Sequence, residues 1–136
     1  MGDEAKQWVA VTVLVFRDGQ MLCMCRAATE DAAPGLWEGV SGRVRPGEDP
    51  FDAALREVVE ETGLRVRIHA RPVTAYAARR RGEPMAVIVF RGDHQDGEVV
   101  LSEEHDAYRW CALPELTELG VPEKLVDAAR KAWSLA

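Results

Sequence analysis

Short apolar runs separated by turn signals dominate the first part of the chain. Residues 8–16 (WVAVTVLVF) are rich in β-branched and aromatic side chains, which is typical of a buried strand. An Asp-Gly pair predicts a tight turn over 17–20, and 21–26 then returns as a second strand. The pattern therefore predicts a β-hairpin at the start of the protein.

The later strands are predicted in the same way, from apolar runs bounded by polar, Gly or Pro residues. The expected extended segments are 36–44, 64 toward 78 with Pro72 as a candidate break, 85–91, 98–101 and 107–111. The expected connections are a loop at 27–35, a hairpin tip at 79–84 and a polar turn at 93–97. Because the sequence contains no repeats or low-complexity linkers, a single domain over residues 1–136 is expected.

A central helix is predicted between Asp49 and Gly63. Asp49 occupies the N-cap position, Pro50 follows just inside, and Gly63 offers a left-handed stop. Further helical segments are expected at 114–119 and 121–135, the latter with an apolar stripe. Strands that alternate with one central and one terminal helix predict an α/β fold, in which a mixed sheet lies between helices.

Wound at ~100° per residue, the central helix separates an apolar side from an acidic side. The apolar side is predicted to contain Phe51, Ala54, Leu55, Val58 and Thr62, with Val59 at its edge and Ala53 beside the acids. Glu57, Glu60 and Glu61 are neighbours on the other side, at spacings of i,i+3 and i,i+4. Such like charges destabilise a bare helix, which suggests that a cation completes the site. The alternative is a solvated acidic face.

An oxygen-rich site of this kind suits Mg²⁺, which keeps several waters and shares its ligand shell with substrate phosphates. Glu48, in the loop before the helix, can fold back toward the same place. Arg56, one turn before Glu60, can orient a carboxylate through a charge-assisted hydrogen bond.

Composition narrows the set of partners. The net charge of −6 argues against broad binding to nucleic acid or to a membrane surface, because both are polyanions. The three cysteines form no zinc pattern; Cys23 and Cys25 are expected to face one side of a strand as small core residues. Free thiols and an N-terminus without signal-peptide features favour a cytoplasmic protein, and the sequence permits a homodimer.

The segment from Gly42 to Leu64 (GRVRPGEDPFDAALREVVEETGL) resembles the Nudix box, G-x5-E-x7-R-E-U-x-E-E-x-G-U, where U is a large aliphatic residue. Every fixed position is filled: by Gly42, Glu48, Arg56, Glu57, Val58, Glu60, Glu61, Gly63 and Leu64. The resemblance implies a Nudix-type α/β/α sandwich with a mixed central β-sheet. It also implies an enzyme, a pyrophosphohydrolase that cleaves a nucleoside diphosphate linked to another group.

The resemblance also implies residue roles. Glu57, Glu60 and Glu61 would ligate Mg²⁺, with Mn²⁺ as an alternative ion, and the carbonyl of Gly42 would join them. Arg56 would orient the acidic cluster, and Glu48 would support it from the loop.

The general base stays open, because members of the family differ in this respect. The candidates are Glu57 within the box and Glu103, Glu104 and His105 in the later segment LSEEHDAYRW. Glu104 is preferred as an added ligand or base, and a surface loop acid is the alternative reading of it.

The substrate is expected to be held by Arg26, at the end of the second predicted strand, and by Arg79 of the run 79–81, which would form a cationic lip. The alternatives are an exposed strand-end arginine and a solvated hairpin tip. Trp37 falls at a position that is commonly aromatic in the family, where it more often packs the loop than stacks a base.

The entry Val40-Ser41-Gly42 and the segment 104–110 are similar to the branch that includes dihydroneopterin triphosphate and dATP diphosphatases. This likeness implies hydrolysis of a nucleoside triphosphate-like substrate to pyrophosphate and a nucleoside monophosphate. The alternative enzymes act on oxidised dNTPs, on ADP-ribose or on other nucleoside diphosphate derivatives. A different class of function is a non-catalytic nucleotide sensor, although such domains typically have an eroded box.

Overall fold

The computed structural model describes residues 6–135. Within this range, eight strands form one mixed sheet: β1 Trp8–Arg17, β2 Gln20–Arg26, β3 Trp37–Glu38, β4 Val40–Arg43, β5 Arg65–Ile68, β6 Thr74–Arg80, β7 Glu83–Asp96 and β8 His105–Cys111. The helices are α1 Pro50–Thr62, α2 Leu113–Glu118 and α3 Glu123–Trp133. The expectation that the first residues carry no signal peptide rests mainly on residues 1–5, which lie outside the described part.

Strand β1 is the centre of the fold. It runs parallel to β7 and antiparallel to β2 and β4. Successive side chains of a strand point to opposite faces of the sheet. Accordingly, Val11, Val13 and Val15 belong to the core cluster under α1, whereas Leu14 and Phe16 belong to the cluster under α3. A nearly continuous apolar run is what a strand buried on both faces requires.

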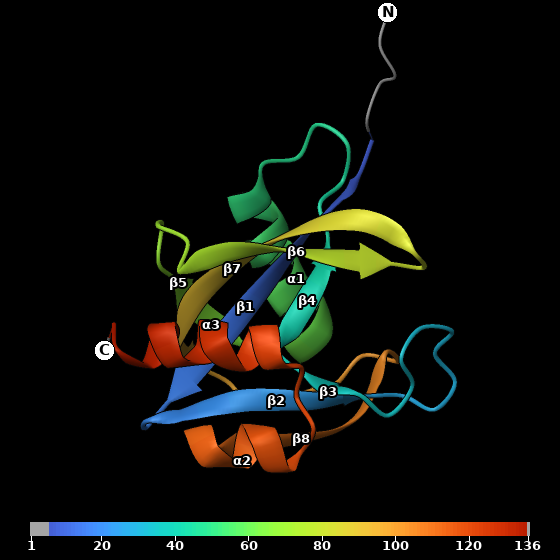
Figure 1. Ribbon diagram of the computed structural model, residues 1–136. Coiled ribbons are helices and arrows are strands. Elements are labelled where there is room, and N and C mark those ends of the chain that lie inside the picture. The colour runs from blue at the N-terminus through green and yellow to red at the C-terminus, as the bar shows by residue number, and fades with distance from the viewer. Residues whose placement is uncertain (1–5, 136) are drawn as a thin grey trace, which may run out of the picture.

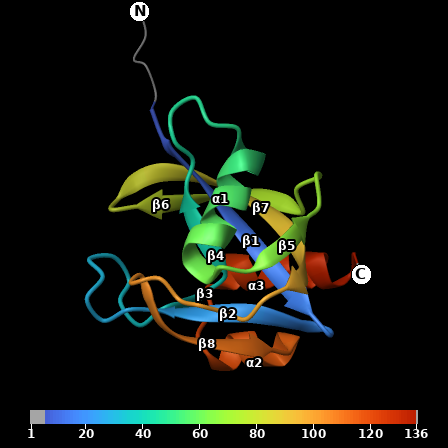
Figure 2. The same ribbon diagram turned by 180° about the vertical axis from the view of Figure 1, so that it is seen from behind.

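Helices cover both faces of the sheet. Helix α3 crosses the near face in Figure 1, and α1 lies in front when the molecule is seen from behind in Figure 2. Strand β2 carries β3 and β8 on its edges, and α2 packs beside α3. The α/β/α sandwich with a mixed central sheet, predicted from the sequence, is therefore confirmed.

The polar turn predicted at 93–97 was wrong, because β7 continues to Asp96. Its last residues pair with β5, with Arg67 opposite Asp93 and Val66 opposite His94. Pairing of backbone groups holds these polar residues in the sheet whatever their side-chain polarity. The extended piece predicted at 98–101 forms no strand, and Val100 N–H instead donates to the Thr62 carbonyl at 2.9 Å.

The segment expected to run from 64 toward 78 is two strands, interrupted around Pro72 as the sequence predicts. The hairpin tip expected at 79–84 is shorter, because only Arg81 and Gly82 lie outside the strands. Both have positive φ, 50° and 80°, which suits a two-residue hairpin turn. Strand β6 therefore extends through Arg80, so its arginines alternate between the two faces of the sheet.

The cysteine prediction holds in part. Cys23 is fully buried in the core cluster under α3, but Cys25 is only half-buried. Over residues 6–135, none of the helices has both the length and the apolar character needed to cross a membrane.

Candidate active site

Helix α1 has the ends that the sequence predicts. Pro50 lies in its first turn, and Gly63 adopts a left-handed conformation with φ 67°, its N–H donating to the Val59 carbonyl at 3.0 Å. Asp49 has the extended backbone of an N-cap residue, but its side chain makes no capping hydrogen bond. Leu64 is buried behind the helix end, as expected.

The predicted faces of α1 need a correction. The buried residues are Ala53, Ala54, Glu57, Val58, Glu61 and Thr62. Leu55 and Val59 are exposed, Val59 to 65%, although they were predicted on or beside the apolar side. The contact stripe is rotated toward the acids because α1 packs against β4, β1 and β5. Two of the three expected ligands, Glu57 and Glu61, are thus buried, while the side chain of Glu60 remains 50% exposed.

Arg56 joins most of this acidic cluster. Its Nε and one terminal nitrogen donate to the two carboxylate oxygens of Glu48, both at 2.9 Å. Its other terminal nitrogen donates to Glu57 Oε1 at 2.8 Å and to Glu60 Oε2 at 3.3 Å, and the Arg43 carbonyl accepts a further bond at 3.1 Å. All five N–H groups of the guanidinium are therefore used, which a lysine could not reproduce. This geometry would allow the predicted roles of Arg56 and Glu48, which stay predictions.

These bonds change the ionisation of Glu48. Hydrogen bonds from the Arg56 guanidinium, and then from the backbone N–H of Arg45, hold the pKa of Glu48 at about 2. The same carboxylates raise the pKa of Arg56 above its usual range, the hydrogen bonds to Glu48 contributing most. The ion pair between Glu48 and Arg56 thereby fixes the loop before α1 against the helix.

Gly42 is needed for the position of Glu57. A Cβ built on Gly42 would lie within 2.6 Å of all three carboxylate atoms of Glu57. The backbone there cannot yield easily, because β4 pairs with β1 and places Gly42 opposite Val11. Only a glycine leaves room for this carboxylate to lie flat against the strand.

Glu61 is the deepest acid of the cluster. Its side chain is buried, and neither of its carboxylate oxygens has a hydrogen-bond partner among residues 6–135. Burial, and then the neighbouring Glu57 carboxylate, raises the pKa of Glu61 far above its usual range. A carboxylate without a donor is costly in such a place, so a cation fits the donor set.

The other candidate general bases differ in how exposed they are to the cleft. Glu104 lies at the same end of the cleft as Glu57 and faces solvent; partial burial and then the Glu57 charge raise the pKa of Glu104. Glu103 is exposed beside it. His105 is buried and does not line the cleft, and its Nε2 is already engaged with Glu38 Oε2 at 2.8 Å. The geometry disfavours His105 as a base and leaves Glu57, Glu103 and Glu104.

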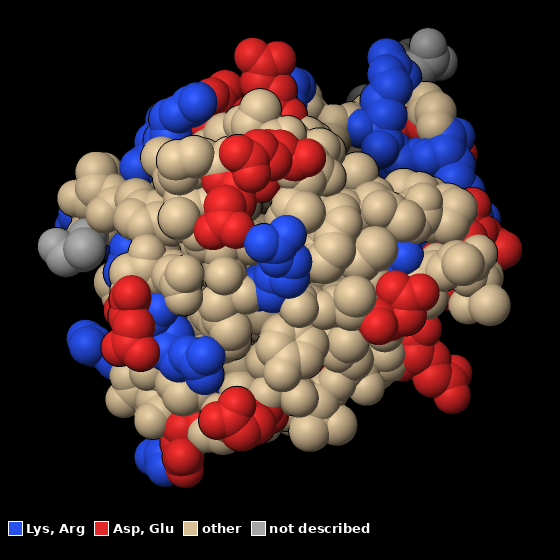
Figure 3. Space-filling view, turned by 90° about the horizontal axis from the view of Figure 1, so that it is seen from below, with Lys and Arg blue, Asp and Glu red and all other residues tan. Residues whose placement is uncertain are grey.

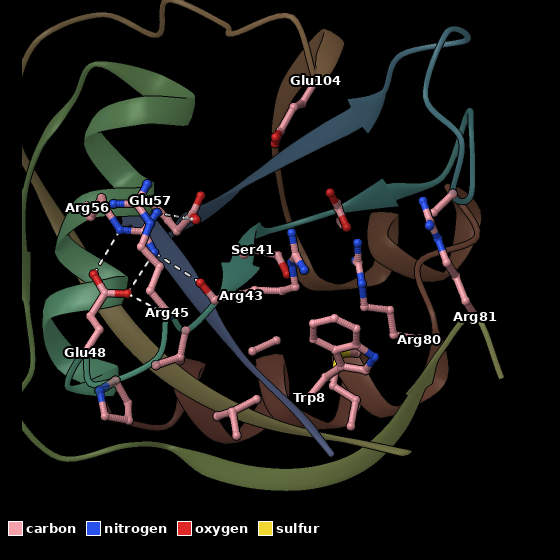
Figure 4. Close-up of a pocket in the computed structure, with 18 of the residues that line it drawn as sticks. Trp8, Ser41, Arg43, Arg45, Glu48, Arg56, Glu57, Arg80, Arg81 and Glu104 are labelled. Carbon is pink, nitrogen blue, oxygen red and sulfur yellow. Dashed lines mark hydrogen bonds and ion pairs between the residues drawn. The ribbon is translucent and has the colours of Figure 1, made fainter. Parts of the chain in front are cut away.

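The acidic cluster forms one wall of an open cleft of about 1300 Å³. Figure 4 shows Glu48, Arg56 and Glu57 on one side and Trp8, Arg80 and Arg81 on the other. The lining includes seven arginines: Arg26, Arg43, Arg45, Arg56, Arg79, Arg80 and Arg81. The six lining glutamates do not outnumber them, although the whole chain carries a charge of −6. Basic side chains also gather at one edge of the face drawn in Figure 3, at its upper right. The cleft is therefore close to neutral, with one more arginine than glutamates, in a chain whose net charge is −6.

The predicted substrate contacts divide into two groups. Arg26 and Arg79 line the cleft. Arg26 is held by Glu30 at 3.2 Å and Glu38 at 3.4 Å, and Arg79 donates to the Gly82 carbonyl at 2.9 Å. The structure does not bring Trp37, the third candidate substrate contact, to the cleft. Its ring packs against the core cluster under α3, so Trp37 is corrected to a packing residue.

Trp8, Arg43 and Arg80 also line the cleft, and the sequence did not single out Trp8 or Arg43. The guanidinium groups of Arg43 and Arg80 lie 5.0 and 5.5 Å from the Trp8 ring. Burial, and then the charges of Arg43, Arg81 and Arg26, lowers the pKa of Arg80. Within residues 6–135, neither Arg43 nor Arg80 forms an ion pair with a carboxylate, so both charges are available to an anion. Only the strand pairing brings these residues together, and no local pattern signals it.

Comparisons with known proteins agree with this geometry. The asymmetrical bis(5'-nucleosyl)-tetraphosphatase of Rattus norvegicus is 35% identical over 94 residues, a match that spans 65% of this chain and 64% of that protein. The CTP pyrophosphohydrolase of Escherichia coli (strain K12) is 32% identical over 114 residues, or 77% of this chain and 76% of that protein. The crystal structure of a MutT protein from Methanosarcina mazei Go1 superimposes with a TM-score of 0.84 at 26% identity, covering 96% of both chains.

The chain spans less than two thirds of the length of the rat protein. The match at the family level is nonetheless nearly complete. The sequence model of the NUDIX domain covers residues 6–133, from the first described strand to the end of α3. The filled box on the loop and helix, the acid-lined cleft and this match agree, and the chain belongs to the Nudix family.

Proposed function

We propose that this protein hydrolyses a phosphoanhydride bond in a nucleoside triphosphate-like substrate, releasing pyrophosphate and a nucleoside monophosphate. One observation carries the proposal. The buried Glu57 and the half-exposed Glu60, which can hold a cation, lie in the same cleft as arginines that have no carboxylate partner among residues 6–135. A polyphosphate needs both kinds of group, because its negative charge repels a nucleophile until cations neutralise it.

Nudix proteins generally use a divalent metal ion, and for this chain we propose Mg²⁺, with Mn²⁺ as an alternative. Glu57, Glu60 and Glu61 would hold the ion, with the carbonyl of Gly42 as a further oxygen donor. The unpartnered oxygens of Glu61 support this assignment. When bound, the ion would neutralise phosphate charge and lower the pKa of a bound water.

The other residues act on the protein side of this chemistry. Arg56 holds Glu57 and Glu60 in one orientation while Glu48 holds Arg56, so the carboxylates are positioned before substrate arrives. Glu104 is proposed as the group that accepts a proton from the attacking water, because it opens to the cleft beside Glu57 and makes no ion pair with the described residues. Glu57 and Glu103 remain the alternatives.

Arginines on the opposite wall are proposed to bind the phosphate chain. Arg26 lies at the end of β2 and Arg79 and Arg80 lie on β6, so the charges come from two strands that are far apart in sequence. The unpaired guanidinium of Arg80 is the strongest candidate, because binding an anion costs it no existing ion pair. Strand β4 adds Arg43 beside it.

The relatives support an oligophosphate substrate. Their names describe hydrolases of dinucleoside tetraphosphates, of CTP and of RNA. A dinucleoside polyphosphate is therefore a second candidate substrate for this chain. Oxidised dNTPs, ADP-ribose and other nucleoside diphosphate derivatives are further alternatives, and a nucleotide sensor without turnover is the alternative of a different class.

A cytoplasmic location is proposed on the basis of the three cysteines, all of which are free thiols. A homodimer is compatible with the sequence. Size-exclusion chromatography with light scattering would test the dimer, because a monomeric mass across the working concentration range would rule it out.

A turnover screen tests the proposed function. The purified protein is incubated with Mg²⁺ and, separately, with dNTPs, NTPs, 8-oxo-dGTP, dihydroneopterin triphosphate, ADP-ribose and dinucleoside polyphosphates, and products are resolved by ion exchange. We expect pyrophosphate and a monophosphate from one triphosphate, with Glu60→Gln as the inactive control. Turnover of ADP-ribose or dinucleotides alone would replace the substrate class, and binding without turnover would favour a sensor.

A further inference from the structure

His105 has one ring nitrogen engaged and the other without a partner. The side chain is fully buried at the start of β8. Its Nε2 lies 2.8 Å from Glu38 Oε2, and since a carboxylate oxygen accepts, Nε2 donates the proton of this bond. Among residues 6–135, Nδ1 has no hydrogen-bond partner, although it is buried. Buried ring nitrogens are normally satisfied, so this one indicates a missing partner.

The unpartnered nitrogen points at the deepest acid of the cluster. His105 Nδ1 lies 3.8 Å from Glu61 Oε1, which is too long for a hydrogen bond. Both oxygens of Glu61 also lack a donor among the described residues. Ligand atoms of Glu61, Glu104 and His105 all lie within 4.8 Å of one another. Three donor groups thus converge on one point without bonding to each other.

A metal ion fits this gap. Two ligand bonds of about 2.1 Å can span up to about 4.2 Å, so a single ion can contact both Nδ1 and the Glu61 oxygen. The Glu104 carboxylate, within 4.8 Å of both, is exposed and can move inward to join them. Metal-binding histidines in proteins are commonly oriented by a hydrogen bond from the other ring nitrogen to a carboxylate. Glu38 provides that carboxylate for His105. The backbone supports the position, because Ala27 N–H donates to the Glu104 carbonyl at 2.8 Å.

The gap lies behind a hollow in the surface. A second hollow of about 300 Å³ is lined by Glu57, Glu60, Glu61, Ser102, Glu103 and Glu104, and it opens to solvent. The oxygens of Glu61 and His105 Nδ1 are themselves buried behind this hollow, so side chains at its floor must shift to admit an ion, but no helix or strand has to unfold. The five N–H groups of Arg56 are used elsewhere, so within the described residues no arginine competes for the carboxylate of Glu61.

We propose that His105 Nδ1, Glu61 and Glu104 form a mixed nitrogen–oxygen site for a divalent transition-metal ion of the Mn²⁺ or Co²⁺ type. An imidazole ligand favours such ions over Mg²⁺, which prefers oxygen donors alone. The site shares Glu61 with the acidic cluster and so rests on the proposed metal-dependent function. It adds a nitrogen ligand and a preference among ions, and where Glu104 serves as a ligand, Glu57 and Glu103 are the candidate bases.

The primary test is a direct measurement on the wild-type chain. Metal-free protein is loaded with one equivalent of Mn²⁺ and examined by electron spin echo envelope modulation spectroscopy. We expect modulation from a directly coordinated ¹⁴N nucleus. A wild-type spectrum without it would overturn the proposal, and no variant has to fold for this outcome to be reached.

Calorimetric titrations with Mn²⁺ and Mg²⁺ provide the second readout. We expect His105→Gln to weaken Mn²⁺ binding by about 10–100-fold and Mg²⁺ binding by much less. Glu38→Gln keeps an acceptor for Nε2–H and should retain the nitrogen signal. The matched control is His94→Gln, because His94 bonds the Gly97 carbonyl away from the site and should leave both affinities unchanged.

The outcomes separate this inference from the proposed function. Equal losses of Mn²⁺ and Mg²⁺ affinity in His105→Gln would show that His105 only supports the acids, and would overturn the mixed site. Turnover together with an all-oxygen Mn²⁺ spectrum would refute the mixed site and leave the proposed hydrolysis intact. Failure to bind any divalent ion would refute both.

Discussion

Gly42→Ala is the change whose effect follows most directly from the structure. The new methyl group would lie within 2.6 Å of the Glu57 carboxylate, whereas non-bonded heavy atoms need about 3.5 Å. Because the nearest carboxylate atom would be only 2.1 Å away, the carboxylate must move by roughly 1.4 Å, and its 2.8 Å bond from Arg56 must lengthen or break. A displacement of that size in a positioned catalytic group is worth on the order of 10²-fold in rate.

The backbone itself does not resist alanine at this position. Gly42 lies in the extended strand β4, and its φ is not positive. Replacing glycine where alanine fits the backbone stabilises a protein by about 0.4–1 kcal/mol through the unfolded state, which offsets part of the steric cost. We therefore expect kcat and metal affinity to fall together while the free energy of unfolding changes by about 1 kcal/mol or less.

Gly92→Ala is the matched control, because it adds the same methyl group in the core. A Cβ there would lie 2.5 Å from Val66 Cγ1 and 3.2 Å from Val13 Cγ1, and Gly92 does not line the cleft. Overpacking of this kind costs about 1–3 kcal/mol of stability. We expect Gly92→Ala to unfold at lower urea concentration but to keep wild-type metal affinity when folded.

The assay combines urea unfolding, calorimetric titration with Mg²⁺ and turnover of whichever substrate the screen identifies. The reasoning fails if Gly42→Ala keeps kcat and metal affinity within twofold of wild type. It also fails if Gly42→Ala loses activity only in proportion to the fraction unfolded, since that would make its effect the same as that of Gly92→Ala.

Three further predictions use the same assays. Glu60→Gln should lower kcat by several orders of magnitude with an unchanged melting temperature, because its carboxylate is half-exposed; near-normal turnover would contradict a metal role. Changing Arg79, Arg80 and Arg81 together to Gln should raise KM and weaken its salt dependence, and an unchanged KM at low salt would assign them to solvent. The pKa of Glu48 is lowered from 4.5 to about 2 in the folded state. Its contribution to the stability of the fold is therefore fully present above pH 4.5 and is lost as the pH falls toward 2. The gap in urea midpoint between wild type and Glu48→Gln should therefore shrink over that range, and a constant gap would refute the ion-pair assignment.

The strands and helices were predictable because their signals are local. The apolar run 8–16 is nearly continuous since β1 is buried on both faces, and the stop at Gly63 depends only on its own backbone. The end of β7 was missed because Asp93 and His94 look like a turn, and only the distant strand β5 holds them in the sheet. Pairing between segments far apart in sequence leaves no mark on the polarity of either segment.

The acidic cluster shows the same limit of prediction from local sequence, here for single side chains. Helical spacing correctly makes Glu57, Glu60 and Glu61 neighbours, but it cannot say which side of α1 meets the sheet. The natural assumption that acids face solvent fails for Glu57 and Glu61, and the exposed side instead carries Val59. Glu57 can be buried because Arg56, on the same helix, donates to it, and the loop residue Glu48 and the Arg43 carbonyl hold Arg56 in place.

That compensation is incomplete, and its distribution argues for a ligand. Arg56 gives four of its five N–H donors to Glu48, Glu57 and Glu60 and the fifth to the Arg43 carbonyl, whereas Glu61 is the most deeply buried of the four acids and receives none of those bonds. If the cluster served stability alone, a buried unpaired acid would be a net cost that a leucine at the same position would avoid. A carboxylate kept there without a donor, beside an open hollow, is therefore best explained by a cation that binds and supplies the missing charge.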